Sequence, residues 1–175
     1  QGTGAVALAG LIAAMRIREE HLSDQRIVFC GAGSAAVGIA DMICAGIADE
    51  HSLTHEEARK LVWMCDSRGL VTFERDSGVE EHKVPYARKG EPAAELLDVV
   101  KRVKPTILIG ASGHPHTFTR DVVLEMNKHC EQPVIFALSN PTSKAECTAE
   151  EAYHWTEGRA IFASGSPFPA VRLKG

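Results

Sequence analysis

The sequence has few cysteines, and their spacing argues against two kinds of small protein. The five cysteines are Cys30, Cys44, Cys65, Cys130 and Cys147. An odd number without a C-x-x-C pair indicates neither a disulfide scaffold nor a cysteine-rich zinc site. Free thiols are typical of reducing compartments, so we expect a cytoplasmic, mitochondrial-matrix or plastid-stromal protein.

The sequence also lacks a basic cluster and a long apolar run. Its formal net charge is -4 and its pI is about 6.1, so no nucleic-acid partner is indicated. No apolar run is long enough to cross a bilayer, and we expect no membrane partner. The 175 residues, of which 45% are hydrophobic, are sufficient for one globular domain with a sizeable core.

Neither end of the sequence carries a start or targeting signal. The chain begins without methionine at Gln1, without the basic start of a secretory signal, and it ends at Gly175 soon after a loop-like Ser-Gly-Ser-Pro segment. We therefore expect residues 1–175 to be one domain cut from a longer protein.

The most informative segment is RIVFCGAGSAAVGIADMI, residues 26–43. A short apolar run meets Gly31 and Gly33, then Ala36, and an apolar-periodic segment follows. This predicts a strand, a tight turn and a helix start with the pattern G-x-G-x-x-A. Backbone N–H groups and a helix N-terminus then face one place, where a pyrophosphate can bind. The alternative is a purely structural glycine turn.

Apolar strands and helical segments alternate along the rest of the chain. The strands are expected at 26–30, 61–65, 70–73, 106–110, 133–138 and 160–163, and the helices at 5–20, 35–49, 54–61, 93–103, 119–129 and from 148. Residues 85–92 read as a loop. This alternation predicts an α/β, doubly wound, mostly parallel Rossmann-type sheet with helices on both faces.

Glycine-rich or polar clusters follow each strand that we expect in the parallel part of the sheet. They are 31–33, 66–68, 110–113, 139–141 and 164–166. Parallel strands bring their carboxyl ends to one edge of a sheet, where ligands of such folds bind. The five clusters together therefore support a binding site better than the first motif alone.

Three residues after the second strand bear on the choice of cofactor. Asp66 is placed to accept hydrogen bonds from an adenosine ribose, although a turn aspartate is the alternative. Ser67 and Arg68 follow directly and are suited to a 2′-phosphate, which favours NADP over NAD, but Arg68 also fits an exposed turn. Lys83 is a weaker candidate for binding the same phosphate. The Asp66 carboxylate argues against a phosphate here, because it would repel the phosphate.

The sequence supports a functional role less clearly for Asn140 and for the histidines His114 and His116. Asn140 follows the strand at 133–138 and can hydrogen-bond a carboxylate, a hydroxyl or a nicotinamide, or simply form an Asn-Pro turn. His114 and His116 flank Pro115 but have no acidic or cysteine partner nearby in the sequence. We therefore assign them no metal.

Several segments together resemble the NAD(P)-binding domain of malic enzymes. They are QGTGAVALAG, LSDQRIVFCGAGSAAVGIAD, MCDSRGL, KPTILIGASG, FALSNPTSKAECTAEEAY and GRAIFASGSPF, in family order over nearly the whole chain. The resemblance implies a domain of an enzyme that decarboxylates (S)-malate oxidatively to pyruvate and CO2, using NAD or NADP with Mg or Mn, and that forms a homo-oligomer such as a dimer or tetramer.

The resemblance also assigns roles to individual residues. The pyrophosphate turn comprises Gly31, Ala32, Gly33, Ser34, Ala35 and Ala36. Asp66, Ser67 and Arg68 face the adenosine ribose and its phosphate, with arginine at a position where NADP-using members commonly carry lysine. Ser112 and Gly113 belong to a second loop along the nucleotide, and Asn140 contacts both the malate and the cofactor.

The family's catalytic lysine and tyrosine and its metal-binding carboxylates lie outside these residues. We therefore expect no catalytic residue and no metal ligand in this chain, which alone would be inactive. Two alternatives remain from the sequence. One is the cofactor domain of another dehydrogenase, such as an amino-acid dehydrogenase. The other is a non-catalytic nucleotide-binding or interaction module.

Overall fold

A single six-stranded sheet organises the computed structural model, which describes residues 2–165 and 170–173. The strand order is β3-β2-β1-β4-β5-β6. The strands are β1 (Ile27–Cys30), β2 (Val62–Asp66), β3 (Gly69–Leu70), β4 (Ile107–Gly110), β5 (Val134–Ala137) and β6 (Ile161–Ser164). All neighbouring strands pair in parallel except β2 and β3, which are antiparallel. The predicted α/β, mostly parallel fold is confirmed.

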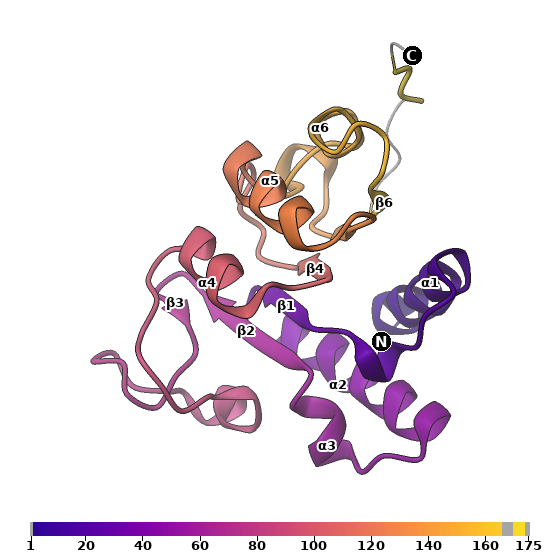
Figure 1. Ribbon diagram of the computed structural model, residues 1–175. Coiled ribbons are helices and arrows are strands. Elements are labelled where there is room, and N and C mark those ends of the chain that lie inside the picture. The colour runs from indigo at the N-terminus through magenta and orange to yellow at the C-terminus, as the bar shows by residue number, and fades with distance from the viewer. Residues whose placement is uncertain (1, 166–169, 174–175) are drawn as a thin grey trace.

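Helices cover both faces of the sheet, because successive side chains of each strand point to opposite faces. Ile27 and Phe29 of β1 belong to the core shared with α1 (Gly2–Arg18) and α2 (Ser34–His51). Val28 and Cys30 belong to the core shared with α4 (Leu96–Val103), α5 (Arg120–His129) and α6 (Ala149–Trp155). Figure 1 shows these two helix groups on either side of the strands.

Helix starts follow the local chemistry that the sequence indicates. Thr54 caps the short helix α3 (His55–Arg59) and Thr148 caps α6, each in a reciprocal capping box with a glutamate three residues later. Thr119 caps α5 by accepting a hydrogen bond from the Val122 N–H. These side chains satisfy backbone donors that a helix start leaves unpaired.

Three of the predicted elements differ from the structure by more than small shifts of their ends. The helix expected at 93–103 begins only at Leu96, because Glu95 has extended backbone at its N-cap. The strand expected at 70–73 is the two-residue β3, which pairs antiparallel with the end of β2. The region expected as a loop from 85 onward begins inside a 3-10 helix, η2 (Glu81–Tyr86).

The strand order places a crevice between β1 and β4. The chain moves outward through β2 and β3, then returns to the other side of β1 to form β4, so the helices that follow β1 and β4 lie on opposite faces of the sheet. In open α/β sheets this switch point is where ligands bind. No helix in the described ranges is long and apolar enough to cross a membrane.

Candidate functional site

A cavity of about 510 Å³ lies at the carboxyl ends of β1, β2 and β4. The loops after all three strands contribute to its wall, together with the start of α4. Its lining residues are Cys30, Gly31, Ala32, Gly33, Cys65, Asp66, Ser67, Gly69, Lys83, Ala94, Glu95, Leu96, Ala111, Ser112, His114 and Thr117. The sequence-predicted clusters after the first three parallel strands therefore surround one cavity.

The glycine turn presents bare backbone to this cavity. Gly31 has a φ of +113°, and a Cβ there would collide with the Ala111 carbonyl of the neighbouring loop. Gly33 is the N-cap of α2, and no heavy atom lies within 4 Å of the position its Cβ would take. Ala36 is 1% exposed, so the helix packs closely onto the sheet. The turn is thus tightly packed at Gly31, against the loop after β4, and open at Gly33.

Ser34 and Ala35 lie in the first turn of α2, directly after this cap. Their backbone N–H groups are among those that a helix start leaves without an intrahelical partner. Together with the positive end of the helix dipole, they form an arrangement suited to an anion. The binding roles predicted for residues 31–36 stay predictions, and their positions are compatible with them.

Asp66 accepts four hydrogen bonds from other parts of the protein. Arg75 donates from Nη1 to Oδ1 and from Nη2 to Oδ2, each at 2.8 Å. Lys83 Nζ donates to Oδ2 at 2.8 Å, and the Arg68 N–H donates to Oδ1 at 2.9 Å. A carboxylate has about four lone-pair sites, so these donors use its capacity. A ribose hydroxyl would have to share or replace one of them.

The carboxyl group of Asp66 is held in its charged form. Burial by itself would raise its pKa, but hydrogen bonds from Arg75 and Lys83 outweigh burial and hold the pKa well below its usual range. The side chains of Asp66 and Arg75 are only 8% and 4% exposed. The repulsion of a phosphate that Asp66 alone would cause is therefore offset by two neighbouring cations.

The 3-10 helix η2 and the residue before it, Glu80, contact the residues around Asp66, and Lys83 of η2 lines the cavity. Glu80 pairs with Arg68 and with Lys83, whose Nζ lies 2.6 Å from Glu80 Oε2. The His82 ring Nε2 donates to the Ala32 carbonyl at 3.0 Å and ties η2 to the glycine turn. Arg68, predicted to bind a 2′-phosphate, is thus directed toward Glu80 and does not line the cavity itself.

Sequence reasoning did not single out Arg75 or Glu80, and it named Lys83 only as a weaker candidate for the phosphate. Lys83 lines the cavity and is 8% exposed. A burial this deep for a lysine requires partners, which Asp66 and Glu80 supply. The available signal was a set of charges of both signs between 74 and 83, after a strand-end aspartate.

A second buried carboxylate joins the loops after β4 and β5. Glu146 is 0% exposed, and its Oε2 accepts hydrogen bonds from the Ser112 N–H at 2.9 Å, the Ser112 hydroxyl at 2.6 Å and the Ser139 hydroxyl at 2.6 Å. Ser139 Oγ in turn accepts from the Gly113 N–H at 2.9 Å. Glu146 therefore fixes the predicted second nucleotide loop, although no sequence pattern singled it out.

Asn140 and Gly113 lie beside the cavity rather than on its wall. Asn140 follows β5, and a Cβ added at Gly165 would lie 2.8 Å from its Oδ1, so the loops after β5 and β6 approach each other there. Ser166, at the end of the last predicted cluster, lies outside the described residues. His114, to which we assigned nothing, is one of the lining residues.

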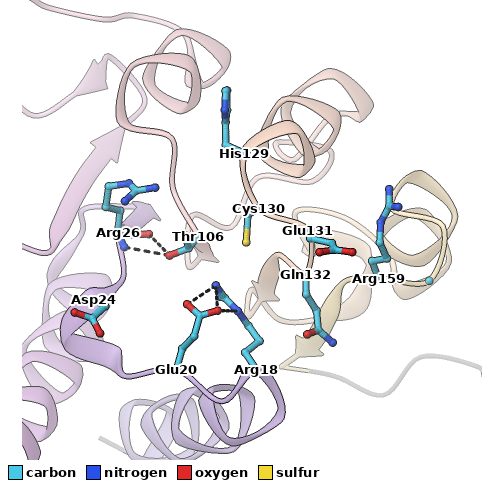
Figure 2. A pocket seen from close by; sticks show the side chains of 11 residues that line it. Arg18, Glu20, Asp24, Arg26, Thr106, His129, Cys130, Glu131, Gln132 and Arg159 are labelled. Atoms are coloured by element: carbon cyan, nitrogen blue, oxygen red, sulfur yellow. Dashed lines mark hydrogen bonds and ion pairs between the residues drawn. The ribbon is translucent and has the colours of Figure 1, made fainter.

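A larger cavity, of about 840 Å³, lies at the opposite end of the strands (Figure 2). Its lining combines cations and anions: Arg18, Glu20, Asp24, Arg26, Thr106, His129, Cys130, Glu131, Gln132, Gly158 and Arg159. Arg18 donates to Glu20, and the Arg26 N–H donates to Thr106 Oγ1 (Figure 2). The acidic and arginine side chains of this lining are equal in number, and Arg18 already pairs with Glu20, so the lining indicates no particular ligand class.

The described residues do not fit a metal site. Among residues 2–165 and 170–173, no three or more His, Cys, Asp or Glu side chains are grouped so that they could hold a metal ion. We therefore derive no chemical step through a metal from this chain.

Comparison with known proteins identifies close relatives of the whole chain. The family model described as malic enzyme, NAD binding domain, matches residues 1–175. The chain is 54% identical over 175 residues to NADP-dependent malic enzyme 4, chloroplastic, of Arabidopsis thaliana, and covers 27% of it. It is 51% identical over 175 residues to the chloroplastic NADP-dependent malic enzyme of Solanum lycopersicum, and covers 30% of it. All of this chain is matched in both cases, but it spans less than a third of either relative.

Solved structures share the fold at lower identity. The malic enzyme of Entamoeba histolytica superposes with a TM-score of 0.68 at 24% identity, over 94% of this chain and 32% of that one. The NAD-dependent malic enzyme of Thermotoga maritima gives a TM-score of 0.68 at 23% identity, over 94% of this chain and 39% of that one.

Proposed function

The chain belongs to the malic enzyme family, as the NAD-binding domain of such a protein, and from that premise we propose that the full-length protein oxidatively decarboxylates (S)-malate to pyruvate with reduction of NADP. This domain holds the dinucleotide. The chain itself spans less than a third of the Arabidopsis thaliana and Solanum lycopersicum relatives.

The observation that carries the proposal is the convergence of three strand-end loops on one cavity. The bare backbone of Gly31 to Gly33, the Asp66–Ser67 turn and the Ser112 loop all line it. A dinucleotide needs an anion site for its pyrophosphate, polar partners for its ribose and a loop along its length. The cavity offers each of these on a different strand.

The chain's own residues bind and orient in this proposal. The amides at the start of α2 hold the pyrophosphate, the cations around Asp66 hold the adenosine end, and the loop fixed by Glu146 supports the remainder. Asn140 orients the malate beside the cofactor. The bound nicotinamide supplies the hydride acceptor. Mg or Mn, and the residues that transfer protons, belong to other parts of the full-length protein in this proposal.

The preference for NADP rests on the cations near Asp66. Arg68, Arg75 and Lys83 provide three positive charges against the two carboxylates of Asp66 and Glu80. A 2′-phosphate favours such an excess of positive charge. The relatives from Arabidopsis thaliana and Solanum lycopersicum, both called NADP-dependent, support the same choice.

A titration of the full-length enzyme with each cofactor tests this assignment. We expect Arg68→Ala to weaken NADP binding about tenfold and to leave NAD binding unchanged, because one charge-assisted contact to a phosphate is worth roughly 1.5 kcal/mol or more. Lys89→Ala, which removes an exposed cation outside this cluster, is the matched control. Equal losses for both cofactors would contradict a 2′-phosphate role for Arg68.

Turnover of the full-length enzyme separates the alternative functions. Malate-dependent NADP reduction is the expected result. Reduction with amino acids instead would indicate an amino-acid dehydrogenase, which the family match disfavours. Cofactor binding without turnover of either substrate would indicate a non-catalytic nucleotide-binding module.

Compartment and assembly are further parts of the proposal. The two relatives named above are called chloroplastic, so we propose a plastid location, and these names give no support to the mitochondrial matrix. We also propose a homo-oligomer, which size-exclusion chromatography with light scattering of the full-length protein would test.

A further inference from the structure

Glu80 occupies the cations that the proposed function reserves for a phosphate. Its Oε1 contacts Arg68 Nη2, and its Oε2 lies 2.6 Å from Lys83 Nζ and 3.8 Å from Arg75 Nη2. Lys83 and Arg75 contact Asp66 as well. One carboxylate therefore bridges three positive side chains on the outer side of the cavity.

We propose that Glu80 is an internal competitor for the 2′-phosphate of NADP and thereby determines how strongly the enzyme discriminates between NADP and NAD. This inference rests on the proposed function. Glu80 presents two anionic oxygens to the cations that would hold the phosphate, so the phosphate and the carboxylate cannot both keep all of these contacts.

The two carboxylates of the cluster differ in how easily they can leave it. The side chain of Asp66 is 8% exposed and accepts four hydrogen bonds. The side chain of Glu80 is 42% exposed. A half-exposed carboxylate can turn into water without the desolvation penalty that fixes a buried one. Glu80 is therefore the group that yields when a phosphate binds.

The charge balance predicts the direction of the effect. Three cations and two carboxylates leave one net positive charge, which a dianionic phosphate exceeds. Without the charge of Glu80 the cluster carries two net positive charges, which match the phosphate. NAD carries no phosphate at this position, so Glu80 can stay on Arg68 and Lys83 when NAD binds.

The test is to measure the Kd of NADP and of NAD for the full-length enzyme and its Glu80→Gln variant. We expect NADP to bind about three- to tenfold more tightly to the variant, because the phosphate no longer has to displace a charged carboxylate from these cations. The Kd of NAD should stay within twofold. Glu81→Gln is the matched control, since it removes the same charge from the next, exposed position.

The ratio of the NADP and NAD dissociation constants distinguishes competition for the phosphate from a general loss of structure. A variant that merely loosens η2 weakens both cofactors together, so only a change in the ratio supports competition. Glu80→Ala should shift the ratio in the same direction as Glu80→Gln. An unchanged ratio, or weaker NADP binding, in both variants would overturn the inference.

Arg68→Ala distinguishes this failure from a failure of the proposed function. If Arg68→Ala selectively weakens NADP while the Glu80 variants leave the ratio unchanged, the phosphate site stands and only the competition is wrong. If Arg68→Ala has no selective effect, or the wild-type enzyme binds no NADP, the phosphate site is wrong and the inference is wrong with it.

Discussion

At the scale of single residues, Asp66 lies at the strand end where the sequence places it, but its hydrogen-bond partners come from the protein itself. The sequence places a carboxylate at the end of β2, where a ribose would approach. In the structure this carboxylate gathers Arg75, Lys83 and the Arg68 N–H around itself. Asp66 therefore organises the cations of the cavity, and any contact to a ribose is added to that role.

Replacing Asp66 by asparagine should destabilise the protein. Asp66→Asn keeps the shape of the side chain but leaves Arg75, whose side chain is 4% exposed, without its charged partner. Losing one member of a buried ion pair costs about 3 kcal/mol. A lowered melting temperature of the full-length variant would show this effect, and Asp76→Asn, an exposed site nearby, is the control.

The ion pairs of Asp66 and Glu80 make the stability of the protein depend on pH in a defined direction. Burial opposes ionisation of Asp66, but Arg75 and Lys83 together lower its pKa well below the usual range, while Lys83 and then Arg68 lower the pKa of Glu80 to about 2. Because both pKa values are lower in the folded state, the two ionised carboxylates contribute fully to the free energy of unfolding above their unfolded pKa of about 4. This contribution is lost as the pH falls further below that value. Melting temperatures measured from pH 6 to pH 3 should therefore fall less steeply for Asp66→Asn than for wild type.

Gly31 should not tolerate a side chain. Its φ of +113° disfavours any L-residue, and a Cβ would meet the Ala111 carbonyl. We expect Gly31→Ala to destabilise the protein by about 1–3 kcal/mol and to abolish cofactor binding. Gly38→Ala, within α2 and without neighbours within 4 Å of the added Cβ, should be tolerated and serves as the control in both measurements.

At the scale of elements, the sequence predicts the strands and their loops because each depends on a short local pattern. Four-residue apolar runs such as Ile107–Gly110 lie buried on both faces, and Thr54, Thr119 and Thr148 cap helices as their neighbours indicate. The late start of α4 was missed, because Ala93 and Ala94 are good helix formers and tertiary context overrides that propensity.

The charged walls of the cavity were less predictable. Arg75 and Lys83 meet Asp66 across 9 and 17 residues of irregular chain, and Glu146 meets Ser112 across 34. Periodicity carries no information about such pairings, since they depend on how loops from different strands fold back. The glycine turn was predictable because its whole geometry is encoded in six consecutive residues.

Glu146 should prove necessary for the order of the two loops it joins. Glu146→Ala removes the acceptor from the Ser112 N–H and from the hydroxyls of Ser112 and Ser139. An unsatisfied buried donor costs roughly 1–3 kcal/mol. Hydrogen exchange of residues 111–114 in the full-length protein should accelerate.

Glu150→Ala, at an exposed position four residues further along, in α6, is the control for this measurement. Its exchange in residues 111–114 should match that of wild type. Equal exchange in Glu146→Ala and wild type would show that the loop holds its conformation without the buried carboxylate.

At the scale of the whole molecule, the sheet separates two apolar cores, and Cys30, Cys44, Cys65 and Cys147 lie inside them, whereas Cys130 lines the larger cavity. All five cysteines are buried and free. Burial raises the pKa of the Cys30 thiol, and it raises that of Cys65 to about 12 and that of Cys44 to about 11. Only the thiolate reacts with alkylating reagents.

These thiols should therefore resist iodoacetamide in the native enzyme at pH 8. Mass spectrometry of the corresponding peptides should show little labelling until a denaturant is added, when all five become modified. Rapid labelling of Cys30 or Cys65, the two that line the nucleotide cavity, would show that the cavity opens more widely than the structure indicates.

The two sides of the sheet end differently, and this bears on how the domain behaves when it is separated from the remainder of its protein. β3 closes one side by antiparallel pairing, whereas β6 is the last strand on the other side within the described residues and is only half-buried. The side chains of β6, Ile161 among them, are only partly covered by the other described residues. We expect the excised domain to be less soluble than the full-length protein, because this apolar surface stays partly exposed.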